Sequence, residues 1–179
     1  MRFRNAAAAS RRAVGLVSLL LASCSPVLDW RDLRPGESGV SLLLPCKAVP
    51  QARSVKLAGQ RVKLSLHVCS AGGQTWALAY ADLVDPVLVA PALAELLARA
   101  ADNLGAKPGQ PLALNVPGAT PHPGALRVAL SGHLPDGKAV QEQVAVFVLG
   151  TRVFQATALG QTLPPDAVDT FFGSLRAAP

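Results

Sequence analysis

Apolar and polar residues alternate along much of the chain between positions 40 and 160, which is the period of strands with one buried face. From Val62 to Val68 every second residue is apolar, and Trp76, Leu78 and Tyr80 share one face of the next run. Turn-forming residues separate these short runs, and Pro45 ends the first of them, Val40 to Leu44. The pattern therefore predicts a series of half-buried antiparallel strands.

The first hairpin can be aligned from its faces. A two-residue turn at Gly59-Gln60 places Gly first, as a type II′ turn prefers. This register sets Lys56 opposite Lys63 on the polar face. Two apolar pairs then share the other face: Leu57 with Val62, and Val55 with Leu64.

A second pair of hairpins is predicted after residue 124. Pro135-Asp136-Gly137 suits a three-residue turn with Gly in the left-handed region. The resulting register sets Val128 against Val144, and Leu126 against Val146. A turn at Gly150-Thr151 then aligns Phe147 with Phe154. Residues 144–149 are apolar on both faces, which is typical of a central strand.

Two segments have the helical period instead. A core-facing stripe at i, i+3, i+4, i+7 and i+11 consists of Leu93, Leu96, Leu97, Ala100 and Leu104. Pro91 suits the first turn, and Gly105 suits the position after the last. A closing helix starts near Pro165 and buries Val168, Phe171, Phe172 and Leu175. Residues 105–124 are rich in Pro and Gly, so we expect at most a short edge strand at Leu112–Val116 there.

Together these elements predict an α+β fold over residues 39–176. We expect a single antiparallel sheet of about seven or eight short strands, with two helices packed on one face. Residues 24–38 are predicted to be a tether with one anchor, Trp30.

The first 23 residues have the pattern of an export signal. Residues 1–12 are basic, and residues 13–22 form an apolar run that is too short to span a bilayer. Leu21-Ala22-Ser23-Cys24 resembles the lipobox of bacterial lipoproteins. That resemblance implies acylation of Cys24, and Ser25 at the next position implies an outer-membrane destination facing the periplasm. The alternatives are an ordinary secretory signal, or a twin-arginine signal around Arg11-Arg12.

Removing the signal changes the charge of the protein. The whole chain has a formal net charge of +6, but residues 24–179 hold 13 basic and 11 acidic residues. No arginine-rich helix or aromatic-interleaved basic strand remains, so we do not expect a nucleic-acid partner.

Three segments carry a further resemblance. They are Leu44-Pro45-Cys46, the run from Gly150 to Ala156, and Phe171-Phe172-Gly173-Ser174-Leu175. The chain is similar in these segments to uncharacterised proteobacterial lipoproteins and, more distantly, to the PsbP/DcrB-like α+β fold. Proteins of that fold are mainly accessory or binding proteins, so the resemblance implies a noncatalytic role.

Cys46, Cys69 and His67 form the one ligand-like group that the pattern suggests. Export to an oxidising compartment favours a disulfide between Cys46 and Cys69. A metal site is the alternative, because His67 and Cys69 point to one face of a strand, with His133 as the candidate for a further ligand. Two free thiols are the third possibility.

No His-Glu-x-x-His, Gly-x-Ser-x-Gly, phosphate-binding or dinucleotide-binding pattern occurs in the sequence. We therefore expect no catalytic residues, no metal and no cofactor. Three functions stay open: a noncatalytic envelope binding or accessory module, a carrier of a small apolar ligand or lipid, and an enzyme with dispersed catalytic residues. A cavity above about 300 Å³ lined by Leu and Ala would favour the carrier.

One hairpin has an excess of positive charge. No acidic residue occurs between Glu37 and Asp82, whereas Lys56, Arg61 and Lys63 lie within eight positions of one another. Like charges that face each other across strands repel, so a bound anion would stabilise them. Besides the membrane that holds the anchor, the expected partners are anionic lipid or an acidic envelope protein. The alternative is a solvated face with no partner.

Overall fold

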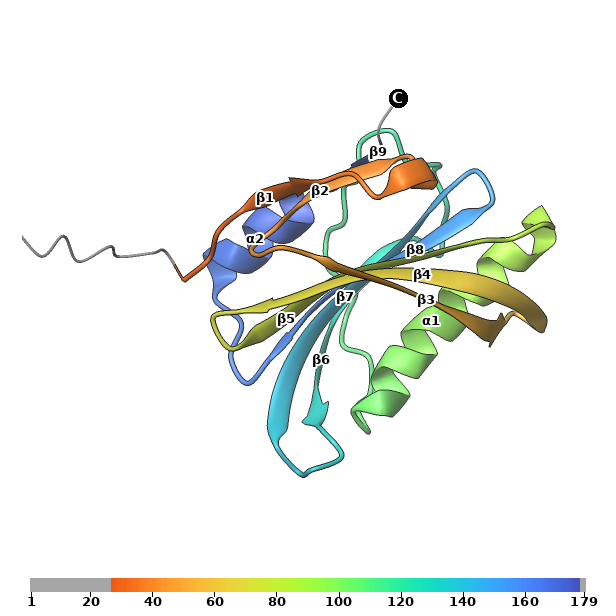
Figure 1. The fold of residues 1–179 in the computed structure, drawn as a ribbon. Coiled ribbons are helices and arrows are strands. Elements are labelled where there is room, and N and C mark those ends of the chain that lie inside the picture. Colours follow the sequence, from red (N-terminus) through yellow and green to blue (C-terminus); the bar gives the residue numbers. More distant parts are fainter. Residues whose placement is uncertain (1–26, 178–179) are drawn as a thin grey trace, which may run out of the picture.

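A computed structural model describes residues 27–177 of the chain (Figure 1). This part of the protein is mostly β, with nine strands in two antiparallel sheets and two α-helices. The predicted single sheet with both helices on one face is therefore wrong. The residues of the predicted lipobox, including Cys24, lie outside the described part.

The larger sheet has six strands. Their order across the sheet is β3 (Val49–Leu57), β4 (Gln60–Ala71), β5 (Gln74–Asp82), β8 (Arg152–Gly160), β7 (Ala139–Leu149) and β6 (Leu126–His133). Every neighbouring pair is antiparallel. Strands β3 and β6 form the edges, and β8 and β5 lie in the middle.

A smaller sheet packs over one face of the larger one. Its central strand is β2 (Val40–Leu44), between β1 (Arg31–Leu33) and β9 (Arg176–Ala177). The alternate residues Val40, Leu42 and Leu44 of β2 are buried in the same cluster as Trp76 and Phe147 of the larger sheet. The two sheets therefore share one core.

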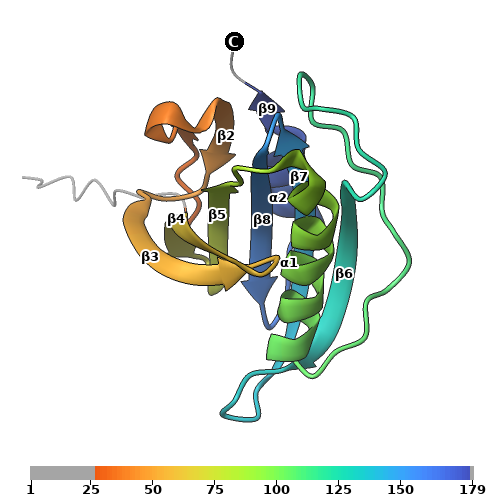
Figure 2. The same ribbon diagram turned by 90° about the vertical axis from the view of Figure 1, so that its right-hand side faces the viewer.

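The helices lie on opposite faces of the six-stranded sheet (Figure 2). Helix α1 (Val89–Asn103) follows a short 3-10 turn, η2 (Pro86–Leu88), and packs with Val146 and Val148 of β7. Helix α2 (Pro165–Gly173) packs on the other face, with Ala145 and Phe147.

The sequence contained a signal for this two-sided arrangement. Residues 144–149 are apolar on both faces, and such a strand needs a covering layer on each side. Alternation along a strand shows which side chains share a face, but it does not show whether the strands belong to one sheet or two. The error lay in assigning every strand to one sheet.

Several local predictions are confirmed. Val128 pairs with Val144 and Leu126 with Val146, around a loop in which Gly137 has φ of 83°. Phe147 lies opposite Phe154, with ring centroids 4.8 Å apart. Both helices bury most of the predicted residues, although Leu97 is half-buried and Leu104 and Leu175 lie just beyond the helix ends. Pro91 and Pro165 lie in the first turns of the two helices.

The register of the first hairpin is wrong by two residues. Val55 pairs with Val62, and Lys56 lies opposite Arg61 rather than Lys63. The turn is Ala58-Gly59, with φ of 47° and 80°, as in a type I′ turn. A shift of two residues keeps each side chain on its predicted face, so the apolar pattern cannot distinguish the two registers.

Part of the predicted tether belongs to the fold. Strand β1 pairs with β2, and a 3-10 turn, η1 (Gly36–Ser38), leads into that strand. The predicted anchor Trp30 packs edge-on against Trp76, with ring centroids 6.1 Å apart.

At the predicted edge strand, only an isolated bridge joins Leu112 to Arg127. Within residues 27–177, no helix is long and apolar enough to cross a membrane.

Candidate functional site

A groove of about 430 Å³ lies between α1 and the β3–β4–β5 half of the large sheet. Helix α1 contacts β7 and β8, so it leaves the neighbouring face of β4 and β5 less covered. Ala77 and Ala79 of β5 leave room there because their side chains are short. The larger apolar side chains around the groove are Val55, Leu57, Leu64, Leu66 and Leu96.

The β3–β4 hairpin closes one end of this groove by bonding to α1. The backbone N–H of Ala58, in the turn, donates to Glu95 Oε2 at 2.6 Å. Arg99 donates to the carbonyl of Lys56 at 2.7 Å, and it also pairs with Glu95. Figure 2 shows β3 curving toward α1 to make this contact. The hairpin and the helix are thus held as two walls of the groove.

Polar side chains form a row on the groove's sheet side. Gln155 Nε2 donates to Thr157 Oγ1 at 3.2 Å, and Thr157 is hydrogen-bonded to Glu142 on the adjacent strand β7. All three line the groove. Glu142 is only 7% exposed, because Leu130 and Leu159 lie opposite it on the two flanking strands.

The environment of Glu142 favours its neutral form. Burial raises the pKa of this carboxyl to about 7, and the hydrogen bond with Thr157 opposes only part of that shift. Within the described part of the chain Glu142 forms no salt bridge. The groove thus combines apolar walls with a buried carboxyl that can donate or accept a hydrogen bond.

Sequence reasoning missed this row, although one signal was present. The confirmed pairing of Val128 with Val144 places Glu142 on the inward face of its strand, next to residues of the core. A carboxyl at such a position needs an explanation, because an unpaired buried charge is costly. The predicted register already placed Glu142 on that inward face, but sequence reasoning considered only the apolar residues of the strand and assigned this carboxyl no role.

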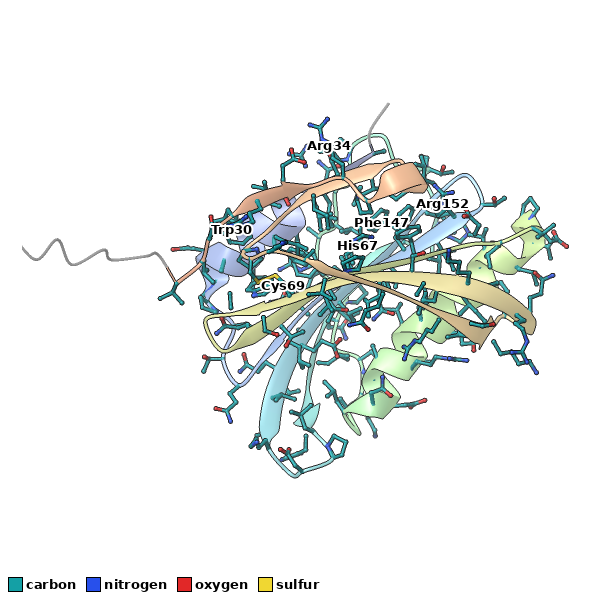
Figure 3. The ribbon with its side chains drawn as sticks, in the orientation of Figure 1. Trp30, Arg34, His67, Cys69, Phe147 and Arg152 are labelled. Atoms are coloured by element: carbon teal, nitrogen blue, oxygen red, sulfur yellow. A yellow bond between two sulfur atoms is a disulfide. The ribbon has the colours of Figure 1, made fainter. Side chains whose placement is uncertain are left out.

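The predicted disulfide between Cys46 and Cys69 is confirmed. The two Cα atoms lie 5.8 Å apart, and Cys69 belongs to the core shared by the two sheets (Figure 3). His67 stacks on Tyr80 instead of joining the cysteines, with ring centroids 6.2 Å apart. Partial burial lowers the pKa of this imidazole. Because both sulfurs are bonded to each other, they do not act as metal ligands, and His133 lies apart at the end of β6.

Lys56, Arg61 and Lys63 are all exposed on the face of the hairpin that points away from the groove. Lys56 and Arg61 face each other directly, so a like-charge pair exists, although not the predicted one. The hydrogen bond from the Ala58 N–H and the pairing with Arg99 lower the pKa of Glu95, and the nearby charge of Lys56 adds to this. Within residues 27–177, neither Arg61 nor Lys63 forms a salt bridge.

A second cavity of about 410 Å³ lies beside these cations. Arg61 and Lys63 line it together with Tyr80 and with the ion pair of Arg152 and Asp82, whose closest atoms are 2.6 Å apart. This ion pair supplies the one acid among the lining residues. The structure therefore brings two of the three predicted cations together at a surface hollow.

Comparisons with known proteins add no family to this description. No protein-family model matches the chain, and no curated protein matches it. Within the described residues, no group of three or more His, Cys, Asp or Glu side chains is placed to hold a metal ion.

Proposed function

We propose that the chain is a noncatalytic, lipid-anchored protein of the cell envelope that binds a small, mainly apolar molecule in the groove beside α1. The observation that carries this proposal is the groove itself. Its volume of about 430 Å³ falls within the range of about 300–1,000 Å³ that is typical of ligand pockets. Leu and Ala side chains make up much of its lining, as the carrier hypothesis requires.

The envelope location is supported by two independent features. The first is the basic, apolar, Leu-Ala-Ser-Cys order of residues 1–24, which suits export and acylation of Cys24. The second is the disulfide between Cys46 and Cys69, since such bonds persist in oxidising compartments. The likeness to proteobacterial lipoproteins and to the PsbP/DcrB-like fold belongs to the same proposal.

A binding role suits the polar groups better than a catalytic one. Gln155 and Thr157 bond to each other, and Thr157 also bonds to Glu142, so they form a fixed row that can orient a ligand. An enzyme is the alternative, because a carboxyl with a pKa near 7 suits general acid–base chemistry. Chemical change of a bound molecule, lost in Glu142→Gln, would support the enzyme instead.

The test is binding of the neutral fluorescent probe N-phenyl-1-naphthylamine to the purified full-length protein. Ala79→Phe fills the groove, and we expect it to weaken probe binding at least tenfold. Ala52→Phe is the matched control. Ala52 is exposed on β3, three positions before Val55, and its side chain lies on the face of the strand opposite to the groove. Equal binding by all three proteins, or no binding by wild type, would contradict a ligand groove.

A further inference from the structure

The polar end of the groove suggests what its ligand carries. Glu142 lines the groove and is 7% exposed, so only a small part of its side chain is open to a molecule in the groove. An ionised carboxylate accepts about four hydrogen bonds. Thr157 supplies one donor, and no cation of the described residues pairs with Glu142. The carboxyl is therefore incompletely satisfied when it is charged.

The charged side chains around the groove do not supply the hydrogen-bond donors that an ionised Glu142 lacks. Arg53 and Arg99 line it, but Arg99 is held by Glu95 and by the carbonyl of Lys56. Arg53 comes from the edge strand β3, whereas Glu142 comes from β7, and three strands separate them. From α1, the lining residues other than Arg99 are Leu96, Ala100 and Asn103, which carry no charge. Beside Glu142 on β6 and β8 lie Leu130 and Leu159.

We propose that the ligand is an apolar molecule with a primary amino group, and that this group lies against Glu142. The inference rests on the proposed function, because it specifies what the groove binds. An ammonium group has three donors and no acceptor, which complements a carboxylate that has one donor already. The apolar body of the ligand then lies on Ala77 and Ala79, between the walls formed by Leu66 and Leu96.

The raised pKa of Glu142 predicts how pH affects this binding. An ammonium favours the ionised carboxylate, so below about pH 7 the ligand must first displace a proton. Each unit of pH below the pKa weakens such binding about tenfold. We therefore expect an amine to bind about thirtyfold more weakly at pH 5.5 than at pH 8, whereas a neutral analogue should bind equally at both.

The experiment compares 4-phenylbutylamine, 4-phenylbutanol and 4-phenylbutyrate, which share one apolar body and differ in the end group. The affinity of each compound for the full-length protein is measured by displacement of the fluorescent probe or by titration calorimetry. At pH 8 we expect the amine to bind at least tenfold more tightly than the alcohol, and the butyrate to bind most weakly. Glu142→Gln should remove the preference for the amine and keep the affinity for the alcohol.

Asp102→Asn is the matched control, since it removes one negative charge from the exposed side of α1. This variant should keep the amine preference. Equal affinities of amine and alcohol for wild type, or an amine affinity that does not change between pH 5.5 and 8, would overturn the inference and leave the groove proposal intact. If neither the probe nor any of the three compounds binds to wild type, the groove proposal itself is refuted. The pH profile of wild type keeps the test decisive if Glu142→Gln does not fold.

Discussion

Glu142 makes a prediction about stability at the scale of a single residue. The pKa of its carboxyl is about 7 in the folded protein, whereas the ordinary value, 4.5, applies to the unfolded chain. Between pH 4.5 and 7 the folded state therefore holds a proton that the unfolded state has lost. The free energy of unfolding should therefore fall as pH rises from about 4.5 to 7, by roughly 3 kcal/mol in total. The stabilising contribution is complete below pH 4.5 and is lost above pH 7.

Urea denaturation of wild type and Glu142→Gln at several pH values measures this effect. We expect the variant to match wild type at pH 4 and to be more stable by roughly 3 kcal/mol at pH 8, because its amide never ionises. The lowered pKa of His67 acts in the opposite direction, but it acts in both proteins and cancels from the difference. If the difference in free energy of unfolding between the two proteins stayed constant from pH 4 to pH 8, the raised pKa of Glu142 would be contradicted.

Ala58 is the second residue with a testable cost. It has φ of 47°, in the left-handed region that a residue with a Cβ enters at a cost of about 1 kcal/mol. The hydrogen bond from its N–H to Glu95 helps to hold this conformation. Asn tolerates the left-handed region, and Asn-Gly is a preferred type I′ turn. We expect Ala58→Asn to raise the free energy of unfolding by about 0.5–1 kcal/mol, as measured by urea denaturation. Ala52→Asn on the same strand should lower it or leave it unchanged.

The same residue explains one limit of sequence reasoning. Gly59 predicts a turn, but Ala before it does not predict a type I′ turn, so the sequence favoured Gly59-Gln60. Here a tertiary contact with Glu95, 37 positions away, helps to select a local conformation that propensity opposes. In contrast, Pro135-Asp136-Gly137 agrees with its own turn, and that hairpin was predicted in the correct register.

At the scale of elements, the disulfide joins the segment after β2 to strand β4 and closes a loop of 23 positions. Loop-closure entropy gives such a bond a contribution of roughly 3 kcal/mol. We expect Cys46→Ala/Cys69→Ala to lose about that amount in urea denaturation under oxidising conditions. Wild type with a reducing agent should unfold at the same urea concentration as the double variant. A loss below about 1 kcal/mol would mean that the loop is already constrained in the unfolded chain.

Elements also show why the candidate site escaped prediction. Strands, helices and most pairings follow from short-range patterns, and these were largely correct. The groove depends on which face α1 covers and on how far the β3–β4 hairpin curves toward it, and neither is encoded in a local period. Glu142, Gln155 and Thr157 become a site only when these elements meet. Ala77 and Ala79 matter because they are small, which a pattern of apolar residues does not reveal.

At the scale of the whole molecule, the anchor is the first prediction. The order of residues 1–24 predicts that Cys24 carries acyl chains in the mature protein. Mass spectrometry of the protein from a membrane fraction should find an acylated amino-terminal residue 24. Cys24→Ser should move the protein out of that fraction, because each buried CH₂ of an acyl chain contributes about 0.8 kcal/mol to membrane binding. A wild-type mature protein that starts elsewhere and lacks acyl chains would contradict the anchor.

The basic face of the β3–β4 hairpin gives the last prediction, and its position in the molecule helps to choose the partner. In Figure 1 the described chain begins at one end of the domain, and the hairpin turn lies at the other. An anchor at Cys24 would therefore hold the domain by the end far from Lys56, Arg61 and Lys63. Charge attraction fades beyond about 8 Å at physiological ionic strength. The membrane that holds the anchor is thus a poorer match for these cations than an acidic envelope protein.

Vesicles test this choice directly. We expect the Cys24→Ser protein to bind vesicles of phosphatidylglycerol at low salt and to dissociate at physiological salt. Arg61→Glu/Lys63→Glu should remove that binding, because these two cations have no salt bridge within the described residues. Lys47→Glu/Arg176→Glu makes the same change of charge elsewhere and should have a smaller effect. Binding that persists at physiological salt and depends on Arg61 and Lys63 would instead favour the lipid surface. Equal binding by both double variants would mean that the basic face is only a solvated surface.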